Sequence, residues 1–357
     1  MIDVVVIGAG LIGTWIANEC ASRGLTVALC DQTDPPGDGI SGRNSGVLHA
    51  GLYYAPGSAK ARHCLRGRKL ALDFFKKHNV PYAICGKLIT PGEPSHIEDE
   101  QRILEIKANA EASGAEDLEI LPNPGTKFLH VRGKIALHSK GTGVVDAAAY
   151  LKILYRVAED AGVMILPGRT FVKGEPGEVT LASPDGSLET IQCEAIVNAA
   201  GLESDSVARA FGLDRFEIRP NRGEYFRLSR TLDTQILVYP LPHIDSTALG
   251  VHYTFHLNGD AYAGPNSIWA ESKTDYRIAA SQEEFHKSLS RILSGFSIND
   301  LQPGYSGLRP RLFENGTAMK DFLVLESPKR VIHMLGIESP GLTSAPSLAH
   351  EVCDLLL

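Results

Sequence analysis

The sequence has no pair of neighbouring cysteines of the kind that structural zinc sites and redox motifs use. Its six cysteines lie far apart, and no two form a Cys-x-x-Cys pair: Cys20, Cys30, Cys64, Cys85, Cys193 and Cys353. Scattered cysteines give no support for a metal site or a disulfide framework, and they are typical of reduced thiols in a cytosolic protein. We therefore expect no metal cofactor.

Excess positive charge and long apolar runs are also missing. Lys and Arg total 35 against 42 Asp and Glu, a net charge of −7 that argues against nucleic acid as the main partner. No apolar run approaches the roughly 18–20 residues of a membrane-spanning helix. The N-terminus shows no basic segment followed by a cleavage site. We expect a cytoplasmic protein without a transmembrane segment, and peripheral contact with the inner membrane stays open.

The length of the chain indicates more than one hydrophobic core. It has 357 residues, of which 43% are hydrophobic. A single core stops growing at roughly 250–300 residues. Two lobes are therefore expected, and the apolar content is high enough to fill both.

The N-terminal residues have the pattern of a dinucleotide-binding unit. Residues 4–7, Val-Val-Val-Ile, form an unbroken β-branched run, typical of a strand buried in a parallel sheet. The run enters Gly-Ala-Gly-Leu-Ile-Gly at 8–13, and a helix pattern follows as far as Arg23-Gly24. Residues 27–30 then predict a second strand, which ends at Asp31. Flanking strands and a terminal acid make the glycine motif specific.

Each residue of this motif has a physical task. Gly8 permits a tight turn, Gly10 lets the backbone approach a pyrophosphate, and Gly13 lets the helix and strand pack closely. The free N–H groups at the start of the helix stabilise phosphate charge. Asp31 follows Gly13 by 18 residues, where a carboxylate can bind the ribose hydroxyls.

Two later segments predict further turns at the same edge of the sheet. Residues 194–201, Glu-Ala-Ile-Val-Asn-Ala-Ala-Gly, are a strand that runs into small residues. Residues 331–336 predict another strand, and a Gly-containing turn at 337–345 follows it and opens a helix. Because the carboxyl ends of parallel strands meet at one edge, the three turns should converge on one ligand. The first glycine motif by itself does not show whether the unit binds FAD or NAD.

Together these segments resemble the FAD-dependent oxidoreductases of the D-amino-acid-oxidase type. The family features are GAGLIG at 8–13, VNAAG at 197–201 and the Gly-containing turn near the C-terminus. Three longer strings look most similar to the L-2-hydroxyglutarate dehydrogenases and oxidases within that family: NSGVLHAGLYYAPGS, YPLPHIDSTALGVHYTFHLNGDAYAGPN and GIESPGLTSAP. The resemblance covers essentially the whole chain. It implies oxidation of a small L-2-hydroxy acid, L-2-hydroxyglutarate or a relative, to the 2-oxo acid by hydride transfer to flavin.

The resemblance implies FAD as the cofactor and assigns residues to it by position. For the ADP half these are Gly8, Gly10, Gly13, Asp31, Val172, Ala200 and Gly201, with Val172 meeting the adenine through its backbone. Along the pyrophosphate and flavin they are Ser41, Asn44, Ser45, Gly46 and Val47. The pyrimidine side of the isoalloxazine would be covered by Gly341, Leu342 and Thr343. A helix N-terminus at that point would stabilise negative charge on reduced flavin.

The implied fold class is α/β, with a Rossmann-like FAD-binding lobe and an α+β substrate lobe built on an antiparallel sheet. The predicted FAD-binding domain is discontinuous and comprises residues 1–76, 143–216 and 330–357. The predicted substrate-binding domain comprises residues 77–142 and 217–329. The chain should therefore cross between the lobes several times.

Local patterns support this division. An amphipathic helix pattern over 146–161 and a strand pattern over 163–166 return the chain to the first lobe. Runs at 225–228, 248–256 and 261–264 predict antiparallel strands in the second lobe.

Oxidation of an alcohol needs a base for the hydroxyl proton, and histidine is the usual choice. Of the 12 histidines, His49 and His252 stand out because both lie in the strings that carry the family resemblance. We favour His49 as the base and His252 as a substrate binder. The sequence leaves the reverse assignment open.

The substrate carboxylate needs a cation, and the string Ser-Gly-Leu-Arg-Pro-Arg at 306–311 offers two. Arginine grips a carboxylate with two parallel hydrogen bonds. Arg309 matches an arginine that binds the substrate carboxylate in the amino-acid-oxidase relatives, whereas Arg311 is explained equally well as a surface residue. Three tyrosines are predicted to orient the substrate: Tyr53, Tyr54 and Tyr253. The basic run at 60–69 predicts a solvated helix face rather than an anion site.

One departure separates this chain from the hydroxyglutarate enzymes, which usually carry an arginine shortly after Gly-Val-His. Here Tyr253 is followed by Thr254, Phe255 and His256. If that arginine holds the distal carboxylate, this protein accepts a shorter or less charged 2-hydroxy acid.

Several alternatives stay open at this point. One alternative is an amino-acid or amine oxidase of the same fold, similar to glycine oxidase. Such an enzyme has less need of a base, so a catalytic role of His49 would distinguish a hydroxy-acid enzyme from it. A non-catalytic FAD-binding subunit that binds a protein or RNA is a second alternative, although the acidic balance weighs against RNA. A nicotinamide dehydrogenase would need a second nucleotide unit. The electron acceptor would be oxygen, a quinone or a carrier protein.

Overall fold

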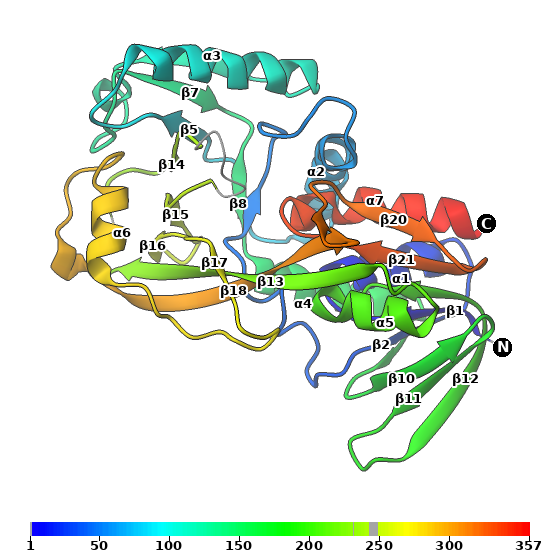
Figure 1. The fold of residues 1–357 in the computed structure, drawn as a ribbon. Helices are drawn as coiled ribbons and strands as arrows, with labels where there is room; N and C mark the ends of the chain where they lie inside the picture. The colour runs from blue at the N-terminus through cyan, green and yellow to red at the C-terminus, as the bar shows by residue number, and fades with distance from the viewer. Residues whose placement is uncertain (1, 231, 243–248) are drawn as a thin grey trace.

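The computed structural model describes residues 2–230, 232–242 and 249–357. These residues form two large sheets and one small sheet. A mostly parallel sheet lies at one end of the molecule and a mostly antiparallel sheet at the other (Figure 1). The long strands β13 (Phe216–Leu228) and β18 (Leu301–Glu314) run between these two ends (Figure 1).

The first sheet contains a parallel core. Its strands, in chain order, are β1 (Ile2–Ile7), β2 (Val27–Cys30), β9 (Met164–Leu166), β10 (Thr170–Glu175), β11 (Glu178–Ala182), β12 (Leu188–Asn198), β20 (Leu323–Glu326) and β21 (Val331–Leu335). The parallel part has the order β21-β12-β1-β2-β9. β20 adds an antiparallel edge, and the β10–β11 hairpin pairs with the first half of β12.

Both faces of this sheet are covered. Val4 and Val6 of β1 belong to one buried cluster, and Val5 and Ile7 belong to another on the opposite face. This alternation is the reason for the unbroken apolar run in the sequence. The helices of this half are α1 (Leu11–Ser22), α2 (Ala59–His78), α4 (Ala147–Asp160), α5 (Ser204–Ala210) and α7 (Gly341–Leu356). The side chain of Asp146 caps α4 by accepting the N–H of Ala149 at 2.9 Å.

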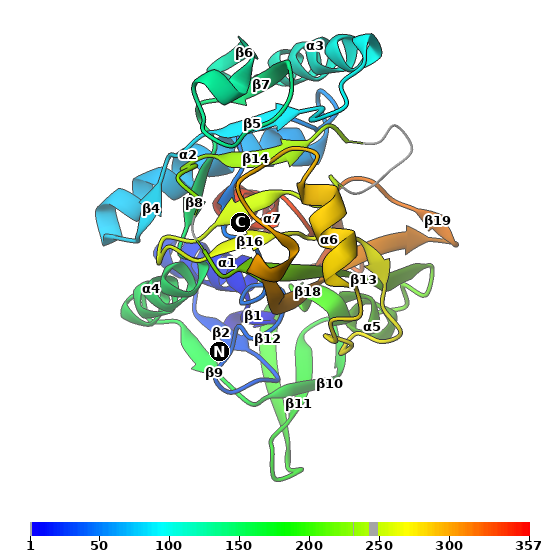
Figure 2. The ribbon, with the colours of Figure 1, turned by 90° about the vertical axis from the view of Figure 1, so that its left-hand side faces the viewer.

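The second sheet has the order β19-β18-β13-β16-β15-β14-β5-β7-β6, and β17 also pairs with β13. Its other strands are β5 (Lys87–Thr90), β6 (Leu118–Pro122), β7 (Ile135–Ser139), β14 (Leu237–Pro240), β15 (Tyr253–Phe255), β16 (Ala261–Ala263), β17 (Ile268–Trp269) and β19 (Thr317–Ala318). Neighbouring strands are antiparallel except for β14 and β5. The helices α3 (Ile97–Ala112) and α6 (Gln282–Leu289) lie on this half of the molecule (Figure 2). A small antiparallel sheet joins β3 (Val47–Leu48), β8 (Gly143–Val145) and β4 (Tyr82–Ala83).

The predicted fold class is confirmed, because a parallel sheet with helices and an antiparallel sheet are both present. The run at 248–256 forms a shorter strand than expected, β15, and its first residue, Ala248, lies outside the described residues. The domain boundaries stay a prediction. β20 lies within residues 217–329 of the predicted second domain but pairs with β21 of the parallel sheet.

Close packing of two glycines shapes the turn between β1 and α1. A Cβ atom on Gly13 would lie 1.9 Å from the carbonyl oxygen of Gly8, so only glycine fits there. Gly8 itself has a φ of +102°, and a Cβ on it would lie 2.5 Å from the carbonyl oxygen of Ala199. The turn after β1 therefore touches the turn after β12, as the sequence predicted for two of its three turns.

Substitution of Gly13 by alanine should destabilise the protein. The added methyl group would meet backbone that cannot move without displacing β1 or α1, and such overpacking costs about 1–3 kcal/mol or more. We expect a clearly lower Tm by circular dichroism. Gly39→Ala is the matched control, since a Cβ on Gly39 would meet no atom within 4 Å and its φ is not in the left-handed region. A Gly13→Ala protein as stable as the control would contradict this account of the turn.

Candidate active site

The turn after β1 is built to hold an anion. Asp31 follows β2, and its carboxylate accepts the N–H groups of Ala9 at 2.7 Å and Thr33 at 2.9 Å. Ser41 Oγ accepts the N–H of Leu11 at 2.9 Å. The N-cap of α1 is a glycine without a capping side chain, and the first turn holds no acidic residue. Although Ser41 accepts one N–H of the first turn, the other N–H groups at the positive end of this helix are available for the negative charge of a ligand.

This turn fits the ADP half of FAD. A Cβ on Gly10 would lie 3.0 Å from Ser41 Oγ, so glycine keeps the approach to the helix N-terminus open. Ala200 and Gly201 come one residue after the end of β12, and the Cα of Ala200 would lie 2.9 Å from a Cβ on Gly8. Val172 lies farther along the sheet, on β10, with 48% of its surface exposed. Its adenine contact stays a prediction.

A cavity of about 990 Å³ opens next to this turn. It is lined by the middle of β13, by β18 from Gly307 to Phe313, by the N-terminus of α7, by α3 and by the loop that precedes α2. Many predicted site residues line it: Ser41, Asn44, Ser45, Val47, His49, Tyr53, Tyr54, His252, Arg309, Arg311, Gly341 and Leu342. The volume is in the range of cofactor and ligand sites. Segments far apart in the sequence therefore meet around one space.

Two of the predicted cofactor-binding residues, Gly46 and Thr343, lie next to the cavity lining without being part of it. Gly46 has a φ of +62° and donates its N–H to Asn44 Oδ1 at 2.8 Å. Thr343 is fully buried on α7 and accepts the N–H of His49 at 3.0 Å. Its hydroxyl also donates to the carbonyl of Val47. The predicted flavin-contacting loop is thus bonded to the start of α7.

Tyr253 does not reach the cavity. Its side chain is fully buried in the core of the second sheet, beside Phe255. Successive residues at the start of a strand point to opposite sides, so His252 faces the cavity and Tyr253 faces the core. The other two predicted tyrosines do line the cavity. The hydroxyl of Tyr53 is buried and has no hydrogen-bond partner among the described residues.

His49 is held in a neutral form. Its ring Nε2 lies 3.1 Å from Ser339 Oγ, and its backbone is fixed by Thr343. The pKa of His49 is lowered to about 3, mainly by burial, with smaller contributions from the positive charge of Lys87 and from His252. A neutral imidazole can accept a proton, so the first requirement of a base is met.

His252 is neutral as well, and its ring is fixed by stacking. Its centroid lies 3.7 Å from that of Tyr239, with 19° between the ring planes. Nδ1 lies 2.8 Å from the carbonyl of Gly250, so Nδ1 carries the hydrogen and Nε2 has the free lone pair. Burial lowers the pKa of His252 to about 3. The roles of the two histidines remain predictions.

Arg309 lies flat against β13. Its Nη1 donates to Asn221 Oδ1 at 2.9 Å and its Nη2 to the carbonyl of Asn266 at 3.2 Å. A Cβ on Gly223 would lie 2.7 Å from Nη2, so this glycine makes room for the guanidinium. Burial lowers the pKa of Arg309, but an arginine stays charged at neutral pH. The cavity therefore contains a fixed cation.

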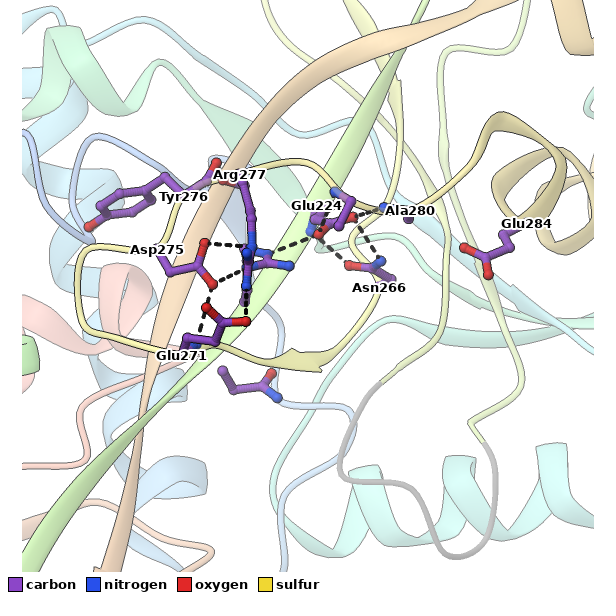
Figure 3. Close-up of polar contacts among 12 residues, drawn as sticks. Glu224, Asn266, Glu271, Asp275, Tyr276, Arg277, Ala280 and Glu284 are labelled. Atoms are coloured by element: carbon purple, nitrogen blue, oxygen red, sulfur yellow. Dashed lines mark hydrogen bonds and ion pairs between the residues drawn. The ribbon is translucent and has the colours of Figure 1, made fainter.

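A buried ion-pair network supports this cation (Figure 3). Glu224 is fully buried and accepts Arg222 Nε at 2.9 Å and the backbone N–H of Ala280 at 2.8 Å. The N–H of Glu224 donates to Asn266 Oδ1 at 2.8 Å. Arg222 also pairs with Asp275. The network thus holds Asn266, whose carbonyl accepts from Arg309.

Arg311 is paired with an acid. Its Nη1 lies 2.8 Å from Glu338 Oε1, and the same oxygen lies 2.8 Å from Lys60 Nζ. Lys60 lines the cavity and His63 is 4% exposed, so the predicted solvated face of α2 is wrong at these two positions. Contacts with α7 and with the residues before it explain the difference.

The departure noted in the sequence lies outside the cavity lining. Thr254 is fully buried, and neither Phe255 nor His256 lines the cavity. His256 packs against the ring of Tyr262 instead, with 4.8 Å between the ring centroids. This segment therefore contributes no side chain to the cavity lining, and the expected preference for a shorter or less charged 2-hydroxy acid stays a prediction.

Sequence reasoning missed several residues around the cavity. Tyr225 and Tyr239 line it, and Lys87 lies behind its wall. Lys87 did carry a signal, because a lysine beside Leu-Ile in a buried strand is rare. The tyrosines carried little signal, since most buried tyrosines only fill space.

The described part of the chain contains neither a membrane-spanning helix nor a cluster of metal-binding side chains. No helix among these residues is long and apolar enough to cross a bilayer. No group of three or more of their His, Cys, Asp or Glu side chains is arranged to hold a metal ion.

Sequence comparison places the chain among known proteins. Residues 3–355 match the DAO family, described as FAD dependent oxidoreductase. The mitochondrial L-2-hydroxyglutarate dehydrogenase of Arabidopsis thaliana is 30% identical over 410 residues, covering 100% of this chain and 83% of that protein. The enzyme of the same name from Salmonella houtenae is 30% identical over 403 residues, covering 99% and 92%.

Solved structures share the fold. L-alpha-glycerophosphate oxidase from Mycoplasma pneumoniae, solved with FAD bound, has a TM-score of 0.89 and 24% identity and covers 99% of this chain and 94% of that one. Glycine oxidase from Geobacillus kaustophilus has a TM-score of 0.82 and 20% identity, with coverage of 99% and 94%. The resemblance found in the sequence is confirmed: the chain belongs to the DAO family of FAD-dependent oxidoreductases.

Proposed function

We propose that the protein oxidises a small L-2-hydroxy acid, L-2-hydroxyglutarate or a relative, to the 2-oxo acid. One observation carries the proposal: neutral His49 and cationic Arg309 line the same cavity. A hydroxy acid needs these two groups, one for its proton and one for its carboxylate. Similarity along the whole chain to L-2-hydroxyglutarate dehydrogenases from a plant, a nematode and a bacterium supports the substrate class.

Bound FAD supplies an acceptor for the hydride that leaves the α-carbon. The ADP half would be held by the turn from Gly8 to Gly13 and by Asp31, Ala200 and Gly201. The flavin end would be held by residues 44–47 and by the start of α7 at Gly341. There the helix N-terminus would favour negative charge on the ring.

His49 would take the hydroxyl proton. Its neutral ring is the correct form for this step, and Ser339 and Thr343 hold it in place. A bound carboxylate raises the pKa of a nearby histidine, because an opposite charge favours the imidazolium. Substrate binding would therefore move His49 from its low pKa toward the range in which a base works best.

Arg309 would grip the carboxylate next to the reacting carbon. Its hydrogen bonds to Asn221 and to Asn266 keep the guanidinium plane fixed. A fixed plane spares the entropy of ordering a long side chain when the substrate binds. Arg311 is a weaker candidate, since Glu338 already pairs with it.

The proposal also includes a cytoplasmic location and an external electron acceptor. The six cysteines of the chain are all free thiols, which fits a reducing compartment such as the cytoplasm. The reduced enzyme would pass its electrons to oxygen, a quinone or a carrier protein. Reoxidation of the substrate-reduced protein by air and by a soluble quinone, followed by absorbance, distinguishes the first two acceptors.

The function is tested by anaerobic mixing of the yellow protein with a panel of 2-hydroxy and 2-amino acids. We expect bleaching of the flavin by L-2-hydroxy acids and little bleaching by their D-enantiomers. Bleaching by amino acids alone would contradict the proposal and favour an amine oxidase of the same fold. Protein that retains no flavin after gentle purification would undercut the whole account.

Replacement of His49 by Gln should slow flavin reduction at least tenfold while FAD still binds. A positioned base typically contributes about 10²–10⁴ in rate, and Gln keeps much of the polar shape without the basic nitrogen. Stopped-flow absorbance measures the rate, and the flavin spectrum measures binding. His252→Gln is the comparison and should mainly raise KM. An unchanged reduction rate in His49→Gln would remove His49 from the mechanism.

Replacement of Arg309 by Lys should raise KM for the hydroxy acid at least tenfold. Lysine keeps the charge but loses the planar fork that makes two parallel hydrogen bonds. Arg219→Lys serves as the control, because Arg219 is exposed on β13 and pairs with Glu217. Steady-state kinetics separates KM from kcat. Equal kinetics for the two variants would show that Arg309 does not bind the carboxylate.

A further inference from the structure

Lys87 is a buried lysine whose ammonium has no hydrogen-bond partner among the described residues. It lies on β5, and its side chain is 0% exposed. Lysine is almost never fully buried unless it is paired, because desolvation of its charge is costly. The cost of burying Lys87 must therefore be offset by other interactions in the structure.

Two tyrosine rings account for part of its stabilisation. Nζ lies 4.9 Å from the ring centroid of Tyr53 and 4.6 Å from that of Tyr239. Contacts at these distances are cation–π interactions, which strengthen when the cation is desolvated. Both tyrosines line the cavity. Lys87 therefore lies directly behind the cavity wall.

The titratable groups around Lys87 leave its charge uncompensated. Cys64 of α2 is close, but burial raises the pKa of its thiol to about 12, so it stays neutral. His49 and His252 both feel the positive charge of Lys87, which lowers their pKa values. Arg309 adds a second positive charge near His252. This part of the cavity therefore has a positive potential, which a low dielectric strengthens.

We propose that Lys87 determines specificity: its ammonium, behind the wall of Tyr53 and Tyr239, attracts a second carboxylate and selects 2-hydroxy dicarboxylates over monocarboxylates. This inference rests on the proposed function, in which Arg309 takes the first carboxylate. Lys87 acts through the field at the wall and through the two rings that it holds. It is a positioning residue and does not take part in the chemistry.

The same geometry couples binding to a proton. Burial lowers the pKa of Lys87 to about 7, so at pH 8 much of the free enzyme carries neutral Lys87. A nearby dianion stabilises the ammonium and raises its pKa again. Binding of a dicarboxylate at pH 8 should therefore take up protons, up to about one per ligand. A monocarboxylate held by Arg309 should take up fewer.

The test compares two unreactive ligands of equal chain length on the FAD-loaded enzyme. Glutarate has two carboxylates and pentanoate has one. Calorimetry measures both Kd values for wild type, Lys87→Met and Lys87→Arg, and repetition in buffers of different ionisation enthalpy measures the protons taken up. Lys140→Met is the control, since Lys140 is an exposed lysine of the same half of the molecule, 53% exposed.

We expect Lys87→Met to weaken glutarate at least tenfold, to change pentanoate less than threefold and to lose the proton uptake. Lys87→Arg should recover part of the preference for glutarate, which also covers the case in which Lys87→Met does not fold. An equal loss for both ligands, or wild-type proton uptake in Lys87→Met, would overturn the proposal. These results can be distinguished from a failure of the proposed function itself. In that case no 2-hydroxy acid would reduce the flavin of the wild-type protein.

Discussion

The antiparallel pairing of β13 with β18 is the interaction on which the cavity depends. One end of this ribbon packs with the parallel sheet, where Phe216 and Leu335 share a buried cluster. The other end enters the core of the second sheet. Between the two ends, Asn221 lies opposite Arg309 and Gly223 lies opposite Gly307. These facing glycines leave room for their neighbours: a Cβ on Gly223 would meet the guanidinium of Arg309, and a Cβ on Gly307 would meet the backbone of Arg43.

Burial then separates the charged groups of the cavity into two kinds. Desolvation is the main reason why His49 and His252 stay neutral, and nearby cations make a further positive charge still more costly. Arg309 stays charged at any ordinary pH. Near Lys60 and Arg311, the carboxylate of Glu338 compensates part of the positive charge. The cavity therefore offers proton acceptors beside fixed cations, which suits an anionic substrate with a hydroxyl proton to lose.

The fold does not choose the chemistry. Proteins with TM-scores of 0.89 and 0.82 to this chain are named as oxidases of glycerophosphate and of glycine, two different substrates. One scaffold therefore serves alcohol and amine oxidation, and the side chains that line the cavity decide between them. In the proposed mechanism of this chain, the histidine comes from the segment between Asn44 and Tyr54, and the arginine comes from β18. The two come together only because the chain crosses repeatedly between the two large sheets.

Local patterns in the sequence determined the dinucleotide turn, its flanking strands and the family, because glycine spacing and apolar runs act over short distances. They also nominated His49, His252 and Arg309 through the strings that carry the family resemblance. Only the tertiary structure placed Tyr253 in the core and paired Arg311 with Glu338. Only the tertiary structure also showed that the ammonium of Lys87 lies behind the rings of Tyr53 and Tyr239. These features depend on desolvation and on contacts between distant segments, and a linear pattern of residue types contains neither.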